Sequence, residues 1–235
     1  MSLCVRKSEN LMSQMREKEA IDAYFKLVQA KGADNATLKK RVLFLEQLSE
    51  HLAEKNVTGQ DYREAVEALM ETIPPEDWHP SLTTAREYFP FWMHDIKAIA
   101  AHNRFPGFDI PPNQWRPATT TLKTLTASLE TEKFETSETW PIKAYTQALR
   151  HEGAELPLVE TRVKLAKMML LRLRGVPERN HKLYRIAVDL TLPLFSNKAS
   201  RRLFLVVVRE FYHFWIGNPD AASKVLQDGS GNILL

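Results

Sequence analysis

The sequence predicts an all-α protein made of two tandem copies of a four-helix unit joined by a proline-rich linker. Apolar residues recur at spacings of three and four along nearly all of the 235 residues, the period of a helix with one buried face. No segment alternates apolar and polar residues between turn signals, and glycine is scarce, at 8 residues. Several residue blocks of the first half also recur, in the same order, in the second half.

Four helices are expected in the first half of the chain. Gly32 is a suitable end for the first, because glycine readily adopts the left-handed conformation of a helix C-terminus. Asn35, Thr58 and Ser81 are expected to cap the starts of the next three. Pro90 implies a kink or a break in the last one. The expected helices cover about residues 8–31, 35–55, 58–73 and 81–102.

A proline-rich stretch separates the two halves. Residues 104–118 carry four prolines and a glycine, and a short amphipathic segment with Leu122, Leu125 and Leu129 follows. Helices are then expected at about 137–151, 157–175, 178–195 and 199–216. The predicted organisation is a first repeat unit over residues 1–104, a linker with a short helix over 105–135, and a second unit with a basic face over 136–235.

The internal duplication is predicted from co-linear matches. REYFPFW begins at Arg86 and REFYHFW at Arg209, 123 residues later. Their aromatic residues share one helix face, which favours a core stripe over a stacking platform for bases or a cofactor. Arg86-Glu87 and Arg209-Glu210 are expected to form ion pairs that support each unit or the contact between them. Further matches pair Tyr24 with Tyr145, Gly32 with Gly153, Arg41 with Arg162, and Tyr62 with Tyr184.

Recognisable catalytic patterns are missing from the sequence. It holds no phosphate-binding loop, no nucleophile elbow and no metalloprotease motif, and Cys4 is its only cysteine. His94-Asp95 is the only adjacent His-Asp pair, and its side chains would diverge by about 100° on a helix. We therefore expect no enzyme and no cofactor. An enzyme with a pocket between the copies would have only His94, Asp95 and nearby aromatic residues to use.

Targeting signals are also missing. The N-terminal residues MSLCVRKSEN lack the apolar stretch of a secretory signal. The longest purely apolar run, residues 203–208, is far shorter than the ~18 residues of a membrane span. A cytoplasmic location without a membrane partner is expected.

Charge is distributed unevenly along the chain. Residues 161–210 contain twelve basic and three acidic side chains, a net +9, whereas the whole chain carries only +3. Such asymmetry favours contact with nucleic acid, although a solvated helix face or a surface docking on an acidic neighbour would look the same. The candidate DNA-binding residues lie at helix ends and starts: Arg172, Arg174, Arg179, Lys182, Lys198, Arg201 and Arg202.

The stretch ASRRLFLVVVREFYHFWIGNPDAA resembles the last helix of the core-binding domain of phage-integrase-type tyrosine recombinases. In the first half, VTGQDYREAVEALM followed by SLTTAREYFPFWM is similar to the helix order of that family. The resemblance implies a helical module that clasps DNA through its backbone. The recombinase catalytic domain has no counterpart here, so strand exchange is not implied.

Two functions follow as expectations. The first is a non-catalytic helical DNA-binding protein that contacts phosphates through the basic second repeat. The alternative is a helical protein–protein interaction module or structural scaffold, either oligomeric or bound to another protein.

Overall fold

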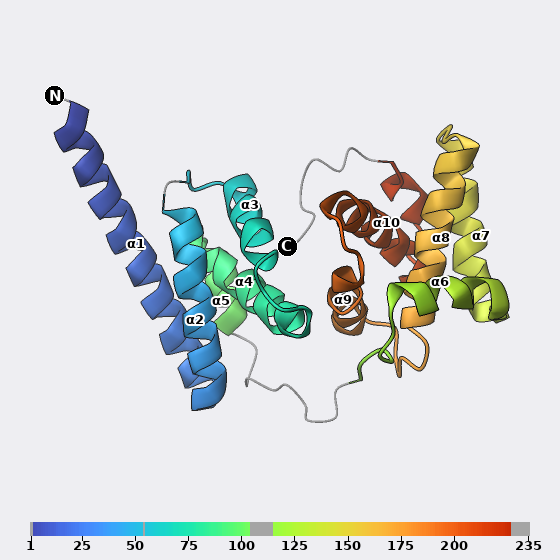
Figure 1. Ribbon diagram of the computed structural model, residues 1–235, viewed down its shortest axis with the longest axis horizontal. Coiled ribbons are helices and arrows are strands. Elements are labelled where there is room, and N and C mark those ends of the chain that lie inside the picture. Colours follow the sequence, from blue (N-terminus) through green and yellow to red (C-terminus); the bar gives the residue numbers. More distant parts are fainter. Residues whose placement is uncertain (1, 54, 104–114, 227–235) are drawn as a thin grey trace. The chain divides into compact units, whose positions relative to one another are not determined.

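The computed structural model describes residues 2–53, 55–103 and 115–226, and every regular element in these ranges is a helix (Figure 1). The predicted all-α fold is therefore confirmed. The chain divides into two compact units between Pro112 and Asn113. No helix in the described ranges is long and apolar enough to cross a membrane.

The first unit is a bundle of four helices followed by a shorter one. The long helix α1 packs against α2 and α4, and α3 packs against α2 and α4, so that α4 lies at the centre of the unit. Its elements are α1 (Ser2–Ala30), α2 (Asn35–Leu52), α3 (Gly59–Met70), the short 3₁₀ helix η1 (Pro75–Asp77), α4 (Trp78–Trp92) and α5 (Ile96–Asn103).

Helix boundaries in the first unit follow local capping chemistry. The predicted cap at Thr58 is confirmed, because its side chain accepts the Asp61 N–H. The predicted cap at Asn35 is wrong by one residue, since Asp34 accepts the Thr37 N–H instead. The predicted cap at Ser81 is also wrong, because the Pro75–Asp77 turn leads directly into α4 at Trp78.

The helix expected to run to His102 is interrupted after Trp92 rather than at Pro90. Pro90 lies inside α4, and the chain reverses at His94, which has a left-handed φ of 53°. The next residue, Asp95, caps α5 by accepting the Ala98 N–H. His94 and Asp95 thus form the turn between two helices.

The second unit contains the helices α7 to α10, preceded by the short helix α6. Helix α8 packs against α6, α7 and α10, and α10 packs against both α7 and α9. The elements are α6 (Leu122–Thr131), α7 (Thr136–His151), α8 (Leu156–Arg172), α9 (His181–Asp189), η2 (Leu192–Leu194), α10 (Lys198–Ile216) and η3 (Ala221–Lys224). The short helix expected after the proline-rich stretch is α6, which packs against α8.

Aromatic rings fill both cores with closely similar geometry. In the first unit, the Tyr62 and Trp92 ring centroids are 5.1 Å apart at an interplanar angle of 42°. In the second, Tyr184 and Trp215 are 5.1 Å apart at 44°. Both tryptophans are buried, as their place in the predicted core stripe requires. The buried hydroxyls also match, because Tyr62 donates to the carbonyl of Ala85 and Tyr184 to that of Val208.

Each unit also holds an arginine, a glutamate and a tyrosine in mutual contact. In the second unit Arg162 and Tyr145 both donate to Oε2 of Glu210, at 2.5 and 2.7 Å. In the first unit Arg41 and Tyr24 both donate to Glu87. The glutamates of the REYFPFW and REFYHFW blocks thus form ion pairs with Arg41 of α2 and Arg162 of α8, partners that the sequence analysis did not name.

Candidate nucleic-acid interface

Arg172, at the C-terminal end of α8, holds its own unit together. Its side chain is buried, and its guanidinium donates to Thr191 Oγ1 at 3.0 Å and to the backbone carbonyls of Ala118 and Leu190. Burial lowers the pKa of Arg172. Since three acceptors of its own unit occupy this guanidinium, we exclude Arg172 from a phosphate-binding surface.

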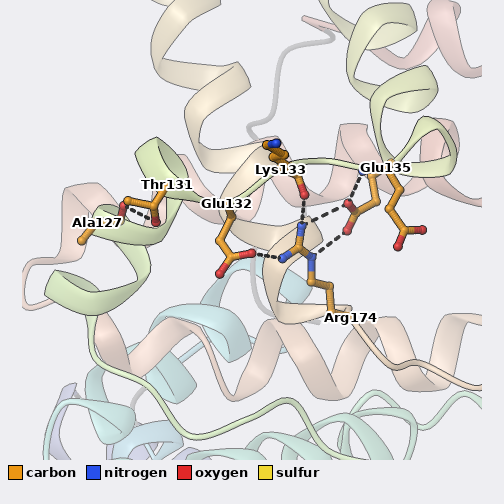
Figure 2. Close-up of polar contacts among 7 residues, drawn as sticks. Ala127, Thr131, Glu132, Lys133, Glu135 and Arg174 are labelled. Atoms are coloured by element: carbon orange, nitrogen blue, oxygen red, sulfur yellow. Dashed lines mark hydrogen bonds and ion pairs between the residues drawn. The ribbon is translucent and has the colours of Figure 1, made fainter.

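Arg174 binds two carboxylates, one just before α7 and one inside it. Figure 2 shows its guanidinium between Glu132, which it contacts at 2.7 Å, and the carbonyl of Lys133, at 2.8 Å. It also donates to Glu138 at 2.9 Å and stacks over the ring of Phe134 at 5.5 Å. Arg174 is therefore an anchor for the α6–α7 connection, with its charge balanced locally.

Arg179 is exposed but also engaged. It donates to the carbonyl of Trp215 at 2.8 Å and to that of Ser137 at 3.3 Å, and its charge lies 5.7 Å from the Trp215 ring centroid. These contacts link the start of α7 to the end of α10, so Arg179 has a structural role in this unit.

The other four candidates lie on the surface of α9 and α10. Lys182, Lys198 and Arg202 are exposed, while Arg201 is half-buried and donates to the carbonyl of Phe195 at 2.9 Å. Lys182 lies at the start of α9 and Lys198 at the start of α10, beside backbone N–H groups that carry partial positive charge. Neither helix has an acidic residue in its first turn.

A row of three cations runs along the exposed side of α10. On an ideal helix, Lys198, Arg202 and Arg209 lie within about 40° of one another and span about 16 Å of the axis. All three are exposed. The sequence-based list of candidates omitted Arg209, and also the exposed Arg185 of α9. Arg209 follows Arg202 by seven residues and Arg185 follows Lys182 by three, so helical spacing alone places each on the same face as a predicted candidate.

The remaining candidates are metal-ligating side chains and the His94-Asp95 pair. No cluster of three or more His, Cys, Asp or Glu in the described part of the chain could hold a metal ion. His94 is an exposed turn residue and Asp95 a helix cap, so both have structural roles.

Comparison with known proteins yields no family for this chain. No protein-family model matches the sequence, no curated protein matches it, and no solved structure matches its fold.

Proposed function

We propose that this chain is a non-catalytic helical protein that binds DNA by its phosphate backbone through the second unit. The observation that carries the proposal is the exposed row of Lys198, Arg202 and Arg209 on α10. Lys182 and Arg185 add two exposed cations on α9. Side chains of this type neutralise phosphates without reading base sequence.

The net charges of the two units support this assignment. The chain up to Pro112 has fourteen basic and seventeen acidic residues, a net −3, and the rest has eighteen and twelve, a net +6. We further propose that the units are copies of one module, in which Lys198 and Arg202 correspond to Pro75 and His79. Lys198 and Arg202 are then additions to the second copy, whereas Arg209 has a counterpart in Arg86.

The proposal is tested by anisotropy titration of a fluorescent DNA duplex at about 50 and 200 mM salt. Replacing Lys198, Arg202 and Arg209 together by alanine should weaken binding and lower the salt slope by about three, nearly one for each lost phosphate contact. The matched control replaces the exposed Lys26, Lys39 and Lys40 of the first unit, which removes the same charge. Absence of binding at low salt, or equal losses in the two triple variants, would overturn the proposal.

A second function, a protein-interaction scaffold, is favoured by exposed apolar side chains. Ile96 of α5, Leu43 of α2 and Leu156 of α8 each expose more than half of their surface. Light scattering distinguishes the two functions. A stable oligomer of the wild type that the α10 triple variant dissociates, with no retention of DNA, would support the scaffold.

A further inference from the structure

Helix α7 exposes a tryptophan on a face that also carries two cations. Trp140 is 61% exposed, whereas Trp78, Trp92 and Trp215 are at most 7% exposed. Lys143, Gln147 and Arg150 are exposed as well. They follow Trp140 at i+3, i+7 and i+10, which places them on the same side of the helix.

The ring of Trp140 makes no ring contact and no hydrogen bond with any residue in the described ranges. The one acidic residue of α7, Glu138, is bonded to Arg174 and to the backbone N–H of Glu135. The Trp140 face therefore combines a large aromatic surface with two cations, and the one acidic residue of its own helix is bonded elsewhere.

This face is not needed to build a four-helix unit. At the spacing of 121 residues that relates Tyr24 to Tyr145, Trp140 corresponds to Glu19 and Lys143 to Asp22. Glu19 and Asp22 are exposed on α1. The first unit thus has two carboxylates where the second has a tryptophan and a lysine, and both units fold.

We propose that the α7 face binds single-stranded nucleic acid, with an unpaired base stacked on Trp140 and phosphates bound by Lys143 and Arg150. Every base offers a π-face to an aromatic ring, and a cationic strip beside the ring follows the sugar–phosphate backbone. Trp140 and Arg150 are about 15 Å apart along the helix axis, a length that several nucleotides span. The bases of an intact duplex are stacked on each other and are closed to Trp140.

The site does not depend on DNA binding by α10, because different helices carry the two surfaces. The contributions of base stacking and of phosphate charge to the affinity are distinguished by titrating the protein with four ligands of equal length. These are oligo(dT), oligo(U), an abasic deoxyribose-phosphate strand, and a duplex. Trp140→Ala should weaken oligo(dT) or oligo(U) binding about 5- to 100-fold, and leave the abasic strand and the duplex unchanged. Trp140→Phe should retain most of the affinity, since it keeps an aromatic ring.

Two further variants complete the experiment. Lys143→Ala combined with Arg150→Ala should weaken the base-bearing and abasic strands alike. Leu156→Ala removes a comparably exposed apolar side chain from α8. It should change the affinity for neither the base-bearing strands nor the abasic strand. A thermal melt of Trp140→Ala should match the wild type, because its ring is exposed.

Three results would overturn the proposal. Trp140→Ala could bind oligo(dT) and oligo(U) as tightly as the wild type does, or it could lose as much affinity for the abasic strand as for these strands. The third result is that Trp140→Ala loses self-association while the wild type binds no strand. Duplex binding abolished by the α10 triple variant, with oligo(dT) binding intact, would separate this site from the proposed function.

Discussion

Arg162 donates a hydrogen bond of 2.5 Å to Glu210 inside the second unit, where both side chains are almost completely enclosed. The same carboxylate accepts the Tyr145 hydroxyl and, through its other oxygen, the backbone N–H of Leu226 at 3.0 Å. Burial, followed by the neighbouring Glu210, raises the pKa of Tyr145 well above its ordinary value. Glu210 thus joins α7, α8, α10 and the segment after η3.

An arginine–glutamate pair of the first unit, Arg41 and Glu87, is more open to solvent. The Glu87 side chain is 25% exposed, against 5% for Glu210. Removing one partner of a buried pair leaves a charge that water cannot reach, which costs about 3–5 kcal/mol. We predict that Arg162→Ala destabilises its unit by about this amount, and that Arg41→Ala costs less because water can solvate Glu87.

Amide hydrogen exchange resolved by mass spectrometry measures this difference, because it reports the opening free energy of each unit separately. Glu210→Gln and Glu87→Gln provide the reciprocal pair of variants. An equal or larger loss for Arg41→Ala would contradict the prediction.

The turn between α4 and α5 offers a stabilising substitution. His94 has a φ of 53°, and a residue with a Cβ pays about 1–2 kcal/mol in this left-handed region. The proposed repeat aligns it with Gly217, which has a φ of 78° at the end of α10. His94→Gly should stabilise the first unit by about 0.5–1 kcal/mol, after the larger chain entropy of unfolded glycine is included.

Gly217→Ala is the reciprocal test of the same backbone requirement. A Cβ at this position would meet no atom within 4 Å, so any loss of stability comes from backbone strain alone. Chemical denaturation should give a loss of about 1 kcal/mol for this variant. A His94→Gly variant less stable than the wild type would show that the imidazole makes a contact worth more than the strain.

The sequence predicts most of the helices and the aromatic cores, since both depend on local periodicity. Tyr88, Phe91 and Trp92 share a face by spacing alone, and all three are buried. The Thr58 cap was predictable for the same reason, because the capping hydroxyl and the Asp61 N–H that donates to it are three residues apart. The left-handed turn at His94 was not, as nothing in its neighbourhood distinguishes it from a helical residue.

The individual roles of the basic residues could not be predicted from the sequence. Arg174 meets Glu132 and Glu138 across 42 and 36 residues of chain, and Arg172 meets Ala118 across 54. These partners lie in or just after the segment predicted to be a linker. A count of charges along the chain shows an excess of cations, but only the folded positions show which groups Arg172, Arg174 and Arg179 bind.

Trp92 should tolerate replacement by phenylalanine better than replacement by alanine. Trp92 is 1% exposed, and its indole N–H has no acceptor among the described residues. Trp92→Phe therefore loses no hydrogen bond and leaves a smaller cavity than Trp92→Ala, so it should cost less than the about 3–5 kcal/mol expected for alanine. Trp215→Ala should cost a similar amount in the second unit. Urea denaturation measures the stability of all three variants. An unchanged midpoint for either alanine variant would contradict the burial of that tryptophan.

The Arg174–Glu138 pair predicts a dependence of stability on pH. Burial alone would raise the pKa of Glu138, but hydrogen bonds from Arg174 and from the Glu135 backbone outweigh it and lower the pKa below the ordinary 4.5. The folded state therefore binds a proton less readily than the unfolded chain. The resulting stabilisation is complete above pH 4.5 and is lost as the pH falls through the lowered pKa.

Glu138→Gln should accordingly be less stable than the wild type near pH 7, by about 1–2 kcal/mol for a partly exposed charge-assisted pair. That difference should shrink as the pH is lowered below 4.5, because the wild-type carboxyl becomes neutral as well. Thermal melts of both proteins over a pH series measure it. Glu130→Gln changes an exposed carboxylate of α6 and should show no such trend. A Glu138→Gln difference that stays constant or grows in acid would mean that this side chain acts through packing rather than through its charge.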